Sequence, residues 1–177
     1  MQGDSPDGPP RALLIAALAV AVGAAVAVLA VAHFRRTPPP PVAIAAVPAP
    51  QSGSPECRTL LATLPDRLGD FRRAAAAEPV PDGTAAWRTD GDPVILRCGL
   101  DRPGGFVAGT PLQMVDDVGW FRVGDPDTGR STWVAVDRPV YVAVTLPDGS
   151  GPTPIQTLSE VIARTMPAMP IRPGAPG

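Results

Sequence analysis

The sequence lacks lysine and asparagine and contains a single histidine, His33. The absence of lysine excludes a phosphate-loop lysine, a Schiff-base lysine and a serine–lysine dyad. His33 adjoins a long apolar run, which argues against histidine-activated nucleophiles and histidine-ligated zinc. The formal charge of −2 argues against nucleic acid as a partner, because nucleic-acid binding needs a basic face. We therefore expect no cofactor, no metal and no catalytic residues.

The apolar run covers residues 12–34 and contains no charged side chain. As a helix it would be about 34 Å long, which is enough to cross a hydrocarbon layer of roughly 30 Å. We predict an uncleaved, single-pass signal anchor. Residues 30–32 also fit the small-x-small pattern of signal peptidase sites, so that cleavage after Ala32 stays open as an alternative.

The orientation of this helix is set by opposing signals. One arginine precedes the run and two follow it, which by the positive-inside rule alone favours a cytoplasmic C-terminus. The free N-terminal amine and the two cysteines favour the opposite arrangement. We predict that the C-terminal domain lies outside the cytoplasm, at the cell membrane.

Proline is abundant, with 25 residues in 177. It is dense over 35–56, which predicts a polyproline spacer through the cell envelope. A docking motif for a proline-recognition domain is the weaker alternative, because such domains are mostly cytoplasmic. Residues 1–11 and 167–177 are also proline-rich, and we predict that both are disordered.

Residues 57–166 predict one α+β domain of two layers, in which antiparallel strands are flanked by an N-terminal and a C-terminal helix. Ser54, followed by proline, predicts the cap of the first helix, and Pro65 its end. Thr153 and Gln156 have the spacing of a capping box at the start of the closing helix. β-Branched or alternating runs predict four strands, over 94–98, 118–123, 132–136 and 140–146.

Cys57 and Cys98 are the only cysteines of the chain. In an exported domain an even number favours a disulfide, here between the first helix and the strand 94–98. A redox-active pair usually has Cys-x-x-Cys spacing, which is missing. Two buried free thiols are the third interpretation, and we predict the structural disulfide.

Seven short segments occur in a characteristic order: Cys57, Leu64-Pro65, Ala86-Trp87, Leu96-Arg97-Cys98-Gly99, Val118-Gly119-Trp120, Val136-Asp137-Arg138 and Tyr141-Val142. In this order they resemble the actinobacterial family called domain of unknown function 3515, over nearly all of 57–166. The resemblance implies small secreted or membrane-anchored envelope proteins of high-GC Gram-positive bacteria. It implies no established activity and transfers no catalytic residue.

Four residues are candidate contacts, either to a ligand or within the structure. If Cys98 faces the core, Arg97 points to the other face of the sheet, where it could bind an anionic ligand. We favour the alternative, an Arg97–Asp137 ion pair that organises the sheet. Arg138 follows Asp137 directly. Trp87, at the edge of a loop rich in proline and glycine, is the tryptophan that we expect at the surface.

Three functions stay open. We favour a non-catalytic, membrane-tethered domain that binds an envelope protein or a cell-wall partner. The alternative is a small hydrolase of envelope glycans, for which Asp116-Asp117 and Asp90-Gly91-Asp92 could supply the carboxylates. The third is a purely structural spacer. Residues 125–129 resemble a calcium loop only superficially, because Val136 stands where an EF-hand needs glutamate, and we predict a hairpin turn.

Overall fold

The structure is a computed structural model that describes residues 11–34 and 39–175. The chain divides into two units, residues 1–40 and residues 41–177, and each is described by itself. The expectations for residues 1–10, 35–38 and 176–177 lie outside the described residues.

The described part of the first unit contains one helix, α1 (Arg11–Phe34). Its side chains are exposed as far as Val31, including all of its leucine and isoleucine residues. By length and composition this helix can cross a membrane, and a signal sequence near the N-terminus has the same properties. The predicted apolar helix over 12–34 is therefore confirmed as a helix.

The second unit is built on one antiparallel sheet of eight strands in the order β1-β2-β3-β4-β8-β7-β6-β5. The strands are β1 (Arg67–Leu68), β2 (Phe71–Ala74), β3 (Thr84–Arg88), β4 (Val94–Leu100), β5 (Gln113–Val115), β6 (Val118–Gly124), β7 (Ser131–Ala135) and β8 (Tyr141–Leu146). The four predicted strands correspond to β4, β6, β7 and β8. Strand β8 pairs with both β4 and β7, so that β1 to β4 and β5 to β7 form one continuous sheet.

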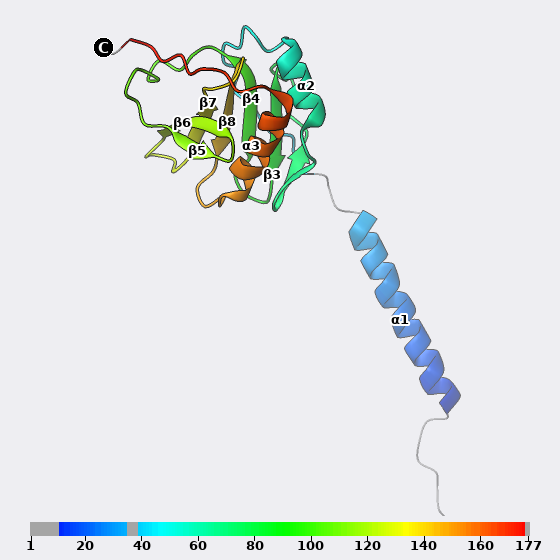
Figure 1. Cartoon of the computed structure of the whole chain (residues 1–177). Helices are drawn as coiled ribbons and strands as arrows, with labels where there is room; N and C mark the ends of the chain where they lie inside the picture. Colours follow the sequence, from blue (N-terminus) through cyan, green and yellow to red (C-terminus); the bar gives the residue numbers. More distant parts are fainter. Residues whose placement is uncertain (1–10, 35–38, 176–177) are drawn as a thin grey trace, which may run out of the picture. The chain divides into compact units, whose positions relative to one another are not determined.

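Two helices, α2 (Pro55–Thr63) and α3 (Thr153–Thr165), cover one face of the sheet (Figure 1). The main core lies between them and the sheet and includes Leu60, Leu96, Trp120 and Leu158, all with 0 % exposure. This arrangement confirms the predicted α+β architecture, with strands flanked by an N-terminal and a C-terminal helix.

The two predicted helix starts have different outcomes. The Ser54 hydroxyl accepts a hydrogen bond of 3.1 Å from the amide of Cys57, so the predicted cap of α2 is confirmed, and α2 ends before Pro65. The capping box of α3 is wrong. Thr153 is already helical, and no side chain caps the helix; the Pro152 carbonyl instead accepts the Gln156 amide at 3.1 Å.

The sheet face away from the helices is covered by irregular chain. Val42 and Ile44 pack on Ala86 and Ile95 with 5 % and 8 % exposure. The Val42 amide and carbonyl also bond the backbone of Ala75 and Ala77, both at 2.8 Å. The predicted spacer over 35–56 is therefore wrong from Pro41 onward, because this segment supplies part of the core of the domain.

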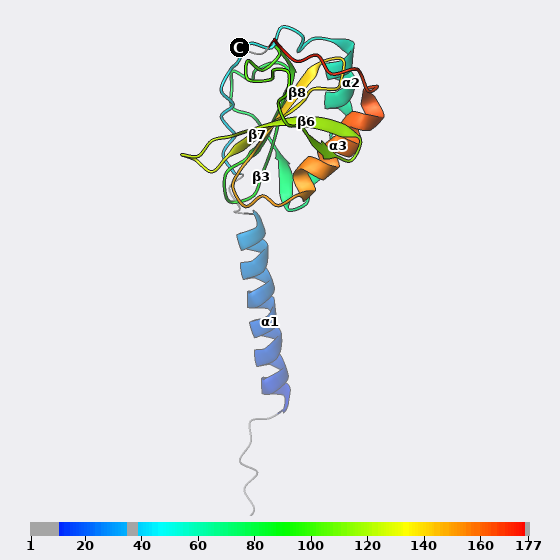
Figure 2. The same ribbon diagram turned by 60° about the vertical axis from the view of Figure 1, so that its left-hand side comes forward.

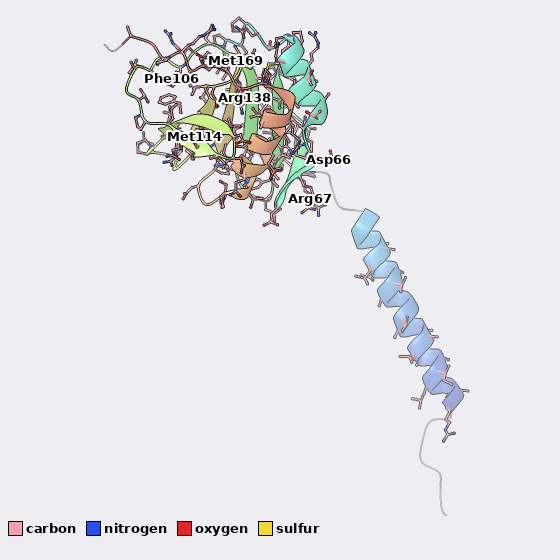
Figure 3. The ribbon with its side chains drawn as sticks, viewed as in Figure 1. Asp66, Arg67, Phe106, Met114, Arg138 and Met169 are labelled. Atoms are coloured by element: carbon pink, nitrogen blue, oxygen red, sulfur yellow. A yellow bond between two sulfur atoms is a disulfide. The ribbon has the colours of Figure 1, made fainter. Side chains whose placement is uncertain are left out.

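The C-terminal tail is likewise part of the domain. The Met169 amide donates to the Asp137 carbonyl at 2.8 Å, and Gly174 exchanges backbone hydrogen bonds with Phe106 and Ala108. Figure 3 shows Met169 next to Arg138, which follows Asp137. The predicted disorder of 167–177 is therefore wrong for residues 167–175, because backbone hydrogen bonds anchor the tail on the domain.

Cys57 and Cys98 form a disulfide that joins α2 to β4, with 5.7 Å between their Cα atoms. Both residues have 0 % exposure and belong to the main core. The predicted structural disulfide is confirmed.

Candidate functional site

Trp87, expected at the surface, is fully buried in the main core, so that expectation is wrong. Its Nε1 donates to the Pro65 carbonyl at 2.8 Å. The guanidinium of Arg73 lies 4.8 Å from the centre of its ring. Burial lowers the pKa of Arg73, against an opposing effect of the Asp66 charge. Trp87 therefore has a structural role: its ring fills the core, and the Arg73 guanidinium lies over that ring.

Asp137 and Arg138 form an ion pair with each other, with 3.0 Å between Oδ1 and Nη1. Asp137 also accepts the Gly119 amide at 2.8 Å, and Arg138 donates to the Asp117 carbonyl at 2.6 Å. The predicted Arg97–Asp137 ion pair is wrong, because the Asp137 carboxylate is paired with Arg138 instead. These contacts join the segment after β7 to the turn before β6, which is a structural role.

Arg97 points away from the helices, as the alternation of β4 predicts, and lies near Ile95. It shares a hollow of about 360 Å³ with Arg88, Arg130 and Asp92, walled by residues 41–45. We call this site the Arg97 hollow. The Arg97 side chain makes one hydrogen bond among the described residues, of 3.4 Å from Nη2 to the Ala45 carbonyl. Burial, and then the charge of Arg130, lower the pKa of Arg97.

A second and larger hollow, of about 510 Å³, lies on the helix-covered side. We call it the Trp133 cleft. It is bounded by β5 to β7, by the first turn of α3 and by the loop 147–152, and its main polar and aromatic side chains are Trp133, Arg122, Asp116, Asp148 and Gln156.

The aromatic side of the Trp133 cleft is held in a fixed position. Trp133 on β7 lies directly opposite Arg122 on β6, and the guanidinium of Arg122 stands 5.5 Å from the centre of the indole ring. The indole Nε1 donates to the Ser131 hydroxyl at 3.0 Å. Trp133 is only partly buried, which leaves part of this ordered aromatic surface available to a ligand.

The rim of the Trp133 cleft combines exposed loop backbone with polar and apolar side chains. Gly149 and Gly151 have positive φ angles of 67° and 69°, which lets the loop before α3 turn closely around the cleft. Asp116 has a positive φ of 49° in the tight turn between β5 and β6. Met114, which Figure 3 labels on β5, is 65 % exposed and also lines the cleft.

The cleft therefore combines an aromatic face with one cation, Arg122, and two carboxylates, Asp116 and Asp148. This set can bind a polar ligand through stacking and hydrogen bonds. Among the described residues, no group of three or more His, Cys, Asp or Glu side chains could hold a metal ion.

The comparison with protein families matches residues 16–171 to a family described as Protein of unknown function (DUF3515). The chain belongs to this family. The match begins within α1 and ends in the C-terminal tail, so it covers most of the apolar helix and nearly all of the domain. The resemblance found in the sequence is thereby confirmed. Comparison with the curated proteins and with the solved structures gave no match.

Sequence reasoning identified only part of the Trp133 cleft. It named Asp116, but it paired this residue with Asp90 and Asp92, and Asp92 lines the Arg97 hollow instead. It missed Arg122 and Asp148, and it expected Trp87 rather than Trp133 to be the exposed tryptophan. The register of the β6–β7 hairpin carries this information. Because residue 124 pairs with residue 131, residues 122 and 133 also pair, and their side chains lie on the same face of the sheet.

Proposed function

We propose that this chain is a single-pass membrane protein whose domain of residues 41–177 lies outside the cytoplasm and binds a component of the cell envelope without catalysis. The apolar helix near the N-terminus supports the anchor. The buried disulfide supports the placement, because disulfides persist in oxidising compartments and are rare in the cytosol.

The observation that carries the binding role is the Trp133 cleft. A ring held by Ser131 and Arg122 needs little further ordering when a ligand stacks on it, so less entropy is lost on binding. Charges of both signs line the cleft, which suits a ligand that is neutral overall and rich in hydroxyl and amide groups. We therefore propose a cell-wall glycan segment as the ligand.

Calorimetric titration of the full chain, in a neutral maltoside detergent, with soluble cell-wall glycan fragments tests this proposal. Trp133→Ala should weaken binding about tenfold or more, since it removes the aromatic anchor. Val123→Ala is the control, because Val123 is exposed on β6 and does not line the cleft. Equal affinities for the wild type and Trp133→Ala would contradict binding in this cleft.

One observation favours a second candidate, a hydrolase of envelope glycans. Asp116 and Asp148 come from different loops and line the same cleft, and glycoside hydrolases use a pair of carboxylates across the scissile bond. In that case the wild type releases reducing ends from cell-wall glycan, and Asp116→Asn and Asp148→Asn each abolish the release. Binding without release by the wild type would favour the non-catalytic role.

A further inference from the structure

The Arg97 hollow lies on the face of the sheet opposite to the face that α2 and α3 cover. It brings together cations from three places: Arg88 at the end of β3, Arg97 in the middle of β4 and Arg130 in the hairpin before β7. The hairpin that joins β6 and β7 projects from the body of the domain (Figure 2), and Arg130 is its last residue before β7.

The hollow has a surplus of positive charge. Arg97 and Arg130 lie in this hollow with a single carboxylate, Asp92, so these three residues have a formal charge of +1. Asp92 only partly neutralises this charge, because it approaches Arg130 no closer than 4.0 Å and its side chain is 66 % exposed. Two cations near each other in a half-buried site repel, and a bound anion would relieve that repulsion.

Hydrogen-bond donors are also left without acceptors there. The Nε atoms of Arg97 and Arg130 are both buried and have no hydrogen-bond partner among the described residues. A buried donor without an acceptor costs free energy, which an anionic oxygen would recover. The guanidinium fork matches the oxygens of a phosphoryl group and binds them more strongly than neutral acceptors.

The wall of the hollow continues directly from the apolar helix. Residues 41–45 form this wall, and only residues 35–40 separate it from the end of α1. Seven steps of chain, from residue 34 to residue 41, reach at most about 25 Å in any conformation. With α1 in a bilayer, this tether holds the wall within that distance of the lipid surface.

From these observations we propose that the Arg97 hollow binds the phosphoryl group of an anionic phospholipid in the bilayer that holds α1. Arg97 and Arg130 donate to the phosphoryl oxygens, and Arg88 adds positive charge. The inference rests on the proposed membrane anchor, but it is independent of the Trp133 cleft and of any glycan.

The test measures thermal unfolding of the full chain by tryptophan fluorescence, in maltoside micelles and phosphate-free buffer. Phosphatidylglycerol, phosphatidylcholine and inorganic phosphate are titrated separately. A ligand that binds only the folded protein raises the melting temperature in proportion to the logarithm of its concentration above Kd. Intact mass of the purified chain shows in the same sample whether the apolar helix is retained.

We expect phosphatidylglycerol to stabilise the wild type at concentrations at which phosphatidylcholine and inorganic phosphate have little effect. Arg97→Gln and Arg130→Gln should each weaken the apparent affinity about tenfold, since each removes a charge-assisted hydrogen bond. Arg164→Gln is the matched control, because Arg164 is exposed on α3 and pairs with Glu160. It should respond as the wild type does.

Each of the following outcomes would overturn one part of the proposal. Equal responses of the wild type, Arg97→Gln and Arg130→Gln would overturn the site. Equal stabilisation by inorganic phosphate and by phosphatidylglycerol would overturn the lipid as the source of the phosphoryl group. A chain that has lost the helix would overturn the anchor, and with it the proposed function, whatever the anion binding shows. If Arg97→Gln fails to fold, Arg130→Gln, which changes a side chain in the hairpin rather than in the middle of β4, decides the question.

Discussion

At the scale of single residues, Arg138 shows how the domain tolerates a buried charge. Its side chain is 2 % exposed, and Asp137 supplies the counter-charge at 3.0 Å. Asp137→Ala would leave this guanidinium buried without a carboxylate. We therefore expect a loss of about 3–5 kcal/mol in the free energy of unfolding, the range seen when one partner of a buried pair is removed. Urea unfolding of the fragment 41–177, which contains the disulfide and the whole core, measures it.

Asp117→Ala is the control for that measurement. Arg138 bonds the backbone carbonyl of Asp117, which the substitution keeps, so the change should stay within about 0.5 kcal/mol. If Asp137→Ala were as mild as Asp117→Ala, the pair could not be what keeps Arg138 buried.

Asp125 gives a prediction on pH. The Thr128 hydroxyl donates to its carboxylate at 2.7 Å, and the Asp127 amide donates at 3.1 Å. These bonds, with that of Thr128 the larger cause, lower the pKa of Asp125 below its ordinary value. The folded hairpin therefore gains stability from the ionised carboxylate above the ordinary pKa of about 3.9 and loses it as the pH falls through the lowered value.

Thr128→Val should raise the pKa of Asp125 toward the ordinary value, because it removes the larger cause of the shift. Titration of the carboxyl carbon by NMR in the fragment 41–177 measures this change. Thr110→Val is the control. The Thr110 hydroxyl accepts a hydrogen bond from the Val107 amide, and among the described residues no hydrogen bond joins it to the hairpin that holds Asp125. An unchanged Asp125 pKa in Thr128→Val would mean that the hydroxyl does not set it.

At the scale of elements, the disulfide is the connection between α2 and β4. It closes a loop of 41 positions, for which the chain-entropy model gives about 4 kcal/mol. We expect Cys57→Ser and Cys98→Ser each to lower the free energy of unfolding by about 2–5 kcal/mol, and the double variant to be no worse than roughly the worse single one. Urea unfolding of the four forms of the fragment measures this. Additive losses would show that the two cysteines act separately.

Local sequence patterns predicted the elements that carry their own signal. Strand β8 alternates between the two faces as expected: Val142 and Val144 enter the main core, and Ala143 enters the cluster on the other face. Strands β1, β2, β3 and β5 were missed. β1, β2 and β5 have only two to four residues, and β3 contains two alanines and only one β-branched residue. The order of strands, with β8 beside β4, depends on contacts distant in sequence.

The packing of residues 41–56 on the sheet could not be read from the sequence either. Proline composition predicts an extended chain, but not what that chain touches. The Gln51 amide bonds the Gly99 carbonyl at 3.0 Å, and a Cβ on Gly99 would lie 2.2 Å from the Ser52 amide nitrogen. Gly99, with a φ of 87°, is therefore what lets the segment approach β4 so closely.

The candidate sites were predicted only in part, for a related reason. Alternation along β4 placed Arg97 on the correct face, because that needs only a period of two. Which tryptophan is exposed depends on what covers each ring. Arg73 and Pro65 close over Trp87, whereas Trp133 lines an open cleft beside the first turn of α3, and both facts belong to tertiary packing.

At the scale of the whole molecule, the disulfide and the apolar helix lead to a prediction of topology. A membrane-impermeant maleimide should not label the full chain on intact cells until a reductant is added, because both thiols are held in the bridge. After reduction and mild denaturation, labelling from the outside should appear. A chain with Cys57→Ser is the control, since its single thiol needs no reductant. Labelling of the wild type without reductant would contradict the bridge and weaken the external placement.

The disulfide also decides how the domain would bear a mechanical load. When a chain is pulled from its two ends, force passes through the Cys57–Cys98 bridge, and residues 58–97 never come under tension. That shielded stretch holds α2 beyond its first turn, β1 to β3 and most of β4. In a single-molecule stretching experiment, a reducing agent would release about 140 Å of additional contour length, at 3.3–3.6 Å per residue. A domain tethered at one end and bound at the other thus carries a built-in limit on how far it can extend.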